Sequence, residues 1–113
     1  MTISRRGDVV LVKFVFADEK GVKRRPAVLI SSETYQQGRP EAVLAAITSH
    51  VGRTLVGDYQ LADWAAAGLP LPSTVTGIVR TIKQDMILRT LGSLSRDDLA
   101  GVEAQLRSSL ALP

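Results

Sequence analysis

The first half of the chain contains three apolar runs of strand length, separated by polar breaks, and this pattern constrains the fold most. The runs cover residues 7–16, 24–31 and 42–49. Aliphatic and β-branched residues in runs of this length favour β-strands. The polar stretch at 17–21 ends in a glycine, which predicts a hairpin connection longer than a two-residue turn. We therefore expect the chain to begin with an antiparallel hairpin that is followed by a third strand.

Two details refine the second and third strands. Pro26 stands inside the second run and has no backbone N–H to give to a ladder, which favours a strand end or a sheet edge there. The third run is apolar nearly throughout, which predicts burial on both of its faces. Between them, residues 33–41 contain Gln-Gln-Gly-Arg-Pro and are predicted to form a loop.

The middle of the chain adds further strands and a first helix. Residues 54–60 are predicted to form a short strand, and residues 73–82 and 86–91 longer ones, because β-branched and aliphatic side chains dominate them. Leu61, Trp64 and Ala65 share one helical face. This spacing predicts a short helix over 61–68 that Gly68 and the following proline end.

The last predicted element is a helix that begins after Ser95. The Ser95 hydroxyl can cap it, and Asp98 stands three residues on, as an acidic variant of the capping box. An apolar stripe follows at spacings of three and four, formed by Leu99, Val102, Leu106 and Leu110. The helix must therefore pack on the sheet or on a second copy. The chain is expected to form a single domain over residues 1–113, mostly β, as a small antiparallel barrel or curled sheet with appended helices.

Composition excludes several classes of function. The chain has no cysteine, so disulfides, thiolate metal sites and a cysteine nucleophile are excluded, and one histidine cannot build a His-rich metal cluster. No apolar run approaches the roughly 18 residues of a membrane span, and no signal-peptide core follows the first residues. We expect a cytoplasmic protein that does not enter a membrane. Aromatic residues make up only 4% of the chain, which weakens any surface that stacks bases on rings.

Basic residues are placed unevenly. The net charge is only +3, but cations gather in the first hairpin, at the entrance to the first strand and in a later strand: Lys20, Lys23, Arg24, Arg25, Arg5, Arg6, Arg80 and Lys83. If they meet in space, they form the footprint of a protein that binds a phosphate backbone. A solvated hairpin turn explains the charge equally well.

Three positions are candidates for phosphate chemistry. Arg25 enters the second strand, and its planar donor fork matches phosphate oxygens; a strand-end arginine in water is the alternative. Lys23 shares its face, whereas Arg24 points the other way. Thr48 and Ser49 close the third strand with a hydroxyl pair that can donate to a phosphate oxygen or satisfy its own backbone.

Two further candidates are less specific. His50 follows the hydroxyl pair and carries an imidazole, which exchanges protons most readily near neutral pH, although a surface role is as simple. Arg80, with Lys83 and Asp85 after it, ends a predicted strand, where cations also discourage edge pairing. Asp18 and Glu19 are adjacent in a turn and point apart, and nothing else resembles a paired-carboxylate metal site. The residues therefore favour a mechanism without metal or other cofactor.

Taken together, these positions resemble the MazF/PemK family of toxin ribonucleases over about residues 6–110. The matching motifs are Arg6-Gly7-Asp8-Val9-Val10, Arg25-Pro26-Ala27-Val28-Leu29, Ile47-Thr48-Ser49, Gly77-Ile78-Val79-Arg80 and Leu91-Gly92-Ser93-Leu94-Ser95. The resemblance implies an SH3-like barrel with a C-terminal helix. It also implies a homodimer, a cognate antitoxin protein and metal-independent cleavage of single-stranded RNA at short sequence motifs.

The resemblance also implies roles for individual residues. Arg25 and Thr48 match the family's catalytic arginine and threonine. The candidates for binding RNA are Lys23, Arg24, Ser49, His50, Arg53, Arg80 and Lys83. The hairpin loop 18–22 is the expected lid over the RNA groove. Some members carry an acid shortly after the arginine that matches Arg80, but the first acid here is Asp85.

Two other functions fit the same sequence. A non-catalytic barrel of this fold would bind nucleic acid or a protein. A toxin like CcdB would inhibit a topoisomerase and would need an apolar C-terminal partner surface, which the last residues, Ala111-Leu112-Pro113, are too short to reveal. A groove that brings Arg25 and Thr48 together would favour the enzyme.

Overall fold

Each predicted strand has a counterpart, but the strand predicted over 54–60 is confined to residues 59–60. The computed structural model describes residues 4–15, 22–52 and 54–113. The strands are β1 (Asp8–Val15), β2 (Val22–Leu29), β3 (Glu41–Thr48), β4 (Tyr59–Gln60), β5 (Thr74–Lys83) and β6 (Ile87–Ser93). The helices are α1 (Glu33–Gly38) and α2 (Arg96–Ser109), and a single 3-10 turn, η1 (Gln84–Met86), joins β5 to β6.

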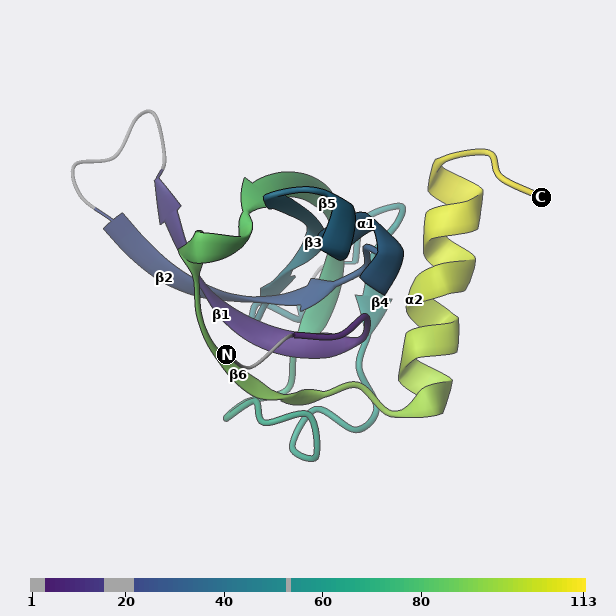
Figure 1. Cartoon of the computed structure of the whole chain (residues 1–113). Coiled ribbons are helices and arrows are strands. Elements are labelled where there is room, and N and C mark those ends of the chain that lie inside the picture. The colour runs from purple at the N-terminus through teal and green to yellow at the C-terminus, as the bar shows by residue number, and fades with distance from the viewer. Residues whose placement is uncertain (1–3, 16–21, 53) are drawn as a thin grey trace.

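The strands form one antiparallel sheet that curls on itself. Their order is β4-β5-β3-β2-β1-β6, and α2 stands alongside the curled sheet (Figure 1). The edge strands β4 and β6 are not hydrogen-bonded to each other in the part of the chain that the structure describes. The predicted fold, a barrel-like antiparallel sheet with a C-terminal helix, is confirmed in this open form.

Successive side chains along the strands point to opposite faces of the sheet and form two apolar clusters, one on each face. Val9, Val28 and Ala45 belong to one cluster, which α2 and the segment 61–75 cover. Their neighbours Val10 and Leu44 belong to the other. The side-chain period of two explains this division. The β3 side chains are thus buried or half-buried on both faces, as predicted.

Pro26 lies where β2 has a ladder on one side. It is opposite Leu11 of β1, and pairing of β2 with β3 begins at Ala27. The edge prediction is therefore confirmed for this part of the strand among the described residues, because the missing N–H of proline interrupts no pair between β2 and β3.

Two predictions of local structure are wrong. The predicted loop at 33–41 contains α1, which Ser32 caps by accepting a hydrogen bond from the N–H of Tyr35. The predicted helix at 61–68 is a series of turns. Leu61, Ala67 and Leu69 are buried there, and this spacing fits no single helical face. The segment contains four alanines and a leucine, which favour a helix, so burial of these three side chains overrides its local propensity.

The predicted cap of α2 is confirmed, but Asp98 does something else. The Ser95 hydroxyl accepts from the N–H of Asp98. The Asp98 carboxylate is 1% exposed and accepts from the Tyr59 hydroxyl (2.9 Å) and from the N–H groups of Ala62 (3.1 Å) and Asp63 (2.9 Å). It therefore fastens the start of the 61–73 segment to the helix. Leu99, Val102 and Leu106 pack toward the core, whereas Leu110 is 57% exposed, so the stripe is shorter than predicted.

The Asp98 carboxylate is expected to make stability depend on pH. Burial by itself raises its pKa, but hydrogen bonds from Asp63, Ala62 and Tyr59 outweigh burial and hold the pKa below its usual value. A depressed pKa stabilises the fold above the unfolded-state value of about 4 and loses that contribution as pH falls through the folded value. Thermal unfolding followed by circular dichroism should show a steeper loss of Tm below about pH 4 in the wild type than in Asp98→Asn. Asp97→Asn, at the exposed neighbouring position, should keep the wild-type slope; equal slopes in all three proteins would contradict this.

Gly68 is expected to be intolerant of a side chain. Its φ is +86°, and an added Cβ would overlap the backbone carbonyl of Leu91 in β6. Gly68→Ala should therefore cost about 2 kcal/mol of unfolding free energy, measured by urea titration. Gly38→Ala is the control, because nothing lies within 4 Å of its added Cβ. If Gly68→Ala were as stable as Gly38→Ala, the close approach of the two backbones would be wrong.

Candidate functional site

A groove of about 840 Å³ opens between the strands and the 68–73 segment. It is lined from β1, β2, β3, β5 and β6, so residues far apart in sequence meet in it. Five sequence-predicted candidates line it: Arg25, Thr48, Ser49, His50 and Arg80. Arg25 comes two residues before Ala27 in β2, and Thr48 two residues after Ala46 in β3. Because Ala27 pairs with Ala46 in an antiparallel ladder, both side chains are directed to the same region of the sheet.

Arg25 lies in β2 opposite Val12 of β1. Its side chain is exposed and forms no hydrogen bond or ion pair with another described residue. A guanidinium placed in this way has all its donors available to an anion.

Thr48 is the last residue of β3 and is half-buried. Its hydroxyl oxygen accepts a hydrogen bond from the backbone N–H of His50 at 3.1 Å, which holds the side chain in place. A hydroxyl can accept and donate at once, so the hydrogen stays available for a ligand in the groove. The Thr48 hydroxyl can therefore accept from the local backbone and donate to a phosphate oxygen at the same time.

Arg80 is held over the ring of Phe14. Its guanidinium carbon lies 5.7 Å from the ring centroid, within the range of a cation–π contact. Phe14 is only 4% exposed, so it provides a fixed base for the cation. Arg80 thus lines the groove from β5, where it lies opposite Leu44 of β3.

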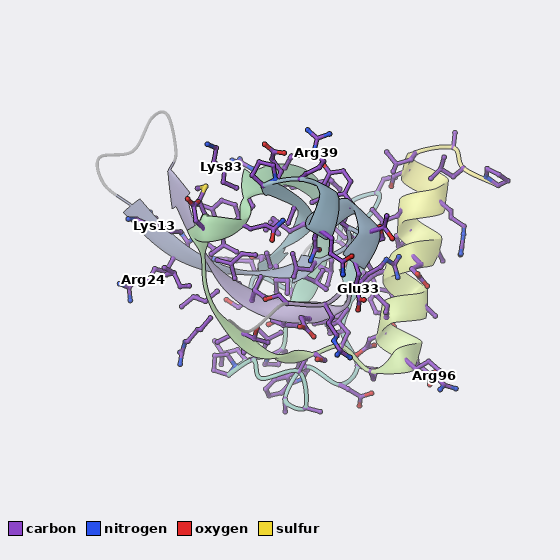
Figure 2. All side chains as sticks on the ribbon, in the orientation of Figure 1. Lys13, Arg24, Glu33, Arg39, Lys83 and Arg96 are labelled. Atoms are coloured by element: carbon purple, nitrogen blue, oxygen red, sulfur yellow. The ribbon has the colours of Figure 1, made fainter. Side chains whose placement is uncertain are left out.

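Several predicted RNA-binding residues lie outside the groove. Lys83 lines an adjoining hollow with Phe14 and Arg80. Lys23 and Arg24 do not line the groove, and Figure 2 shows Arg24 pointing outward near Lys13 at the far end of the hairpin. Arg53 and the predicted lid residues 18–21, including Lys20, fall outside the described residues.

The predicted basic footprint is smaller than the sequence suggests. Arg6 forms an ion pair with Glu103 of α2 and donates to the carbonyl of Ile30 at 3.0 Å. Arg5 lies 3.9 Å from Glu33. Neither lines the groove. They fasten the N-terminal segment to the helices, so expecting them at a common phosphate site is wrong.

Sequence reasoning missed two parts of the groove. Arg89 of β6 lines it, opposite Leu11 of β1. An arginine inside a predicted strand is a signal as good as that of Arg80. The Gly68–Leu71 segment forms one wall, and only its proline and glycine, taken as the end of a helix, marked it beforehand.

Neither a metal cluster nor a membrane span is found in the parts of the chain described here. No three His, Asp or Glu side chains come together as candidate metal ligands in the described ranges. Of the described helices, none has the length and apolar character needed to cross a bilayer.

Comparison with known proteins places the chain in a family. Residues 5–110 match the model of the PemK-like, MazF-like toxins of type II toxin–antitoxin systems. A MazF from Deinococcus radiodurans, solved with MazE, shares 19% identity and a TM-score of 0.81 over 99% of this chain and all of its own. The toxin MazF-mt6 of Mycobacterium tuberculosis shares 21% identity and a TM-score of 0.76 over 94% of this chain and 98% of its own.

A third solved structure has the same fold. An endoribonuclease from a mycobacterial species, in complex with its cognate antitoxin, shares 17% identity and a TM-score of 0.76 over 98% of both chains. A comparison with curated protein sequences found no match. The family match spans almost the entire chain, and the fold agrees with it. The chain therefore belongs to the PemK-like, MazF-like toxins of type II toxin–antitoxin systems.

Proposed function

We propose that this toxin is a metal-independent endoribonuclease that cuts single-stranded RNA at short sequence motifs. The observation that carries the proposal is the shared groove: Arg25 from β2 and Thr48 from β3 both line it, together with Arg80. A cation and a hydroxyl donor in one groove suit a substrate phosphate. This arrangement favours the enzyme over a barrel that only binds nucleic acid.

The chemistry is an in-line attack of the ribose 2′-hydroxyl on the adjacent phosphorus. The 2′-oxygen–phosphorus bond forms, the bond from phosphorus to the 5′-oxygen breaks, and the products are a cyclic phosphate and a 5′-hydroxyl end. The Arg25 guanidinium offsets the charge that grows on the nonbridging oxygens. It keeps its proton at neutral pH, so its role is electrostatic.

Protons must leave the 2′-hydroxyl and reach the departing 5′-oxygen. His50 is exposed and lines the same groove, so its imidazole is the candidate for these transfers. Thr48 donates its hydroxyl hydrogen to a nonbridging oxygen, while its oxygen holds the N–H of His50. One threonine thereby couples the donor to the position of the proton-transfer group.

The proposed partners follow from the family. Solved relatives include a MazF with MazE and an endoribonuclease with its cognate antitoxin. These support an antitoxin protein as the partner of this chain. A homodimer is the proposed assembly, and no cofactor is required.

The test is cleavage of a long single-stranded RNA by purified protein in EDTA, with the new ends mapped. Discrete cuts with 5′-hydroxyl ends support the proposal. A folded protein that makes no cuts would favour a barrel that only binds nucleic acid or protein, or a CcdB-like inhibitor. A topoisomerase relaxation assay tests for the inhibitor. Cuts that appear only when divalent ions are restored would contradict the metal-independent mechanism.

Thr48→Val should separate the hydroxyl from the shape of the side chain. Valine keeps the volume but neither accepts from His50 nor donates to phosphate, so kcat should fall about 10–100-fold. Thr48→Ser keeps both functions and should stay within about threefold of the wild type. Single-turnover cleavage of a short RNA measures both variants. If serine were as damaging as valine, the hydroxyl would not be the important group.

A further inference from the structure

The groove has a polar end and an apolar wall. Besides the hydroxyl and guanidinium groups, its lining includes Leu71 and Ile78. These side chains are 54% and 55% exposed. The groove thus combines exposed aliphatic side chains with groups that suit a phosphate. Such a groove fits a ligand that is partly charged and partly apolar. A nucleotide of single-stranded RNA has that character, because every base has an apolar face.

Among the described residues, phenylalanine, tyrosine and tryptophan rings offer little stacking surface in the groove, which leaves the imidazole of His50 as its exposed ring. Phe14 lines the groove but is 4% exposed, and the Arg80 guanidinium lies over its ring. Single-strand binders usually stack bases on accessible rings. Here the surface available to a base face consists mainly of aliphatic side chains and guanidinium planes. The two exposed aliphatic residues therefore carry a role that aromatic residues perform elsewhere.

Two contacts hold the segment that carries the apolar wall. The Asp98 carboxylate accepts from the N–H groups of Ala62 and Asp63. Gly68 approaches the backbone of β6 so closely that it has no room for a Cβ. A wall fixed at two points keeps its shape in the absence of ligand. Such preorganisation lowers the cost of binding and allows discrimination by shape.

The groove is large enough for more than a phosphate. Its volume of about 840 Å³ falls in the range of about 300–1,000 Å³ that encloses small organic ligands. A phosphate at Arg25 therefore leaves room for a neighbouring nucleoside along the wall.

We propose that Leu71 and Ile78 form a base-selecting contact, which accepts one unstacked nucleobase next to the phosphate held by Arg25. The proposal rests on the proposed function and adds to it the surface that chooses the cleavage site. Leu71 comes from the fixed 68–71 wall and Ile78 from β5, so the two elements grip the base from separate parts of the fold.

The first test compares cleavage profiles on a pool of RNA substrates with every base at each position near the cut. In Leu71→Ser and Ile78→Ser, kcat/KM at the preferred site should fall about tenfold through KM, with kcat within about twofold. Base preference at one position flanking the cut should relax. Leu88→Ser is the matched control, because Leu88 is 43% exposed but does not line the groove. An unchanged profile in both groove variants would overturn the proposal.

The second test does not depend on cleavage. Four homo-oligomers with 2′-fluoro sugars lack the attacking hydroxyl, and their binding is measured by fluorescence anisotropy. The wild type should prefer one base, and Leu71→Ser but not Leu88→Ser should lose that preference. Equal affinity of the wild type for all four bases, or a preference kept in Leu71→Ser, would overturn the proposal. A wild type that binds selectively without cutting would instead count against the proposed ribonuclease alone.

Discussion

Arg25→Ala is expected to lower kcat for RNA cleavage by about 10²–10³-fold. The Arg25 guanidinium is exposed in the groove, and none of the described residues forms a hydrogen bond or ion pair with it. Its loss removes the charge that faces the scissile phosphate in the proposed mechanism. It should leave folding intact, because no internal contact of the described chain depends on it.

Two variants make this result specific. Arg25→Lys keeps the charge but loses the planar fork, so it should recover only part of the rate. Arg96→Ala removes an exposed arginine at the start of α2, which Figure 2 shows pointing away from the sheet, and should cut like the wild type. Single-turnover rates with excess enzyme give kcat for all four proteins, and far-UV circular dichroism verifies their folding.

The pattern across these variants distinguishes the mechanisms. Equal losses in Arg25→Ala and Arg96→Ala would indicate a dependence on net charge. A full rate in Arg25→Lys would indicate a point charge and not a bidentate clamp. A full rate in Arg25→Ala would remove Arg25 from the chemistry and leave Arg80 and Arg89 as the cations of the groove.

Much of the sheet could be predicted because its signals are local. Each of the five longer strands begins and ends within two residues of its predicted range. The reason is that runs of Val, Ile and Leu and their polar breaks are visible in the sequence. The cap of α2 was equally local. The segment 61–68 was predicted wrongly because its conformation depends on Asp98, more than thirty residues away, and on the backbone of β6.

The residues of the candidate site likewise divide into those that local sequence signals identify and those that only the fold identifies. Arg25 and Thr48 could be selected because each stands at the polar end of an apolar run in the sequence. The sheet then brings both residues into one groove. Arg6 could not be distinguished from a phosphate ligand, because its acidic partner Glu103 lies on α2. Arg89 carries the same local signal as Arg80, an arginine inside a predicted strand, but this signal does not say which face the side chain takes. Only the pairing of β6 with β1 brings it into the groove.

Asp98→Ala is expected to be the most destabilising single change outside the apolar core, at about 3–4 kcal/mol. The substitution removes one acceptor that serves the Tyr59 hydroxyl and two backbone N–H groups. All three donors would stay in a partly buried site without a charged partner, and a buried donor costs about 1–3 kcal/mol when left unsatisfied. A domain of this size has only about 5–15 kcal/mol in total. Urea unfolding followed by tryptophan fluorescence measures the loss. Asp97→Ala, at the exposed neighbouring position, should lose less than about 1 kcal/mol.

A double-mutant cycle shows whether the loss belongs to this network. Tyr59→Phe removes only one donor and should cost about 1 kcal/mol in the wild type. In the Asp98→Ala background the same change should cost close to nothing, because the acceptor has already gone. Additive losses would mean that the Tyr59 hydroxyl and the Asp98 carboxylate stabilise the protein independently. Strong coupling would mean that α2, through Asp98, holds Tyr59 in the same network as the segment that leads to the wall of the proposed RNA groove.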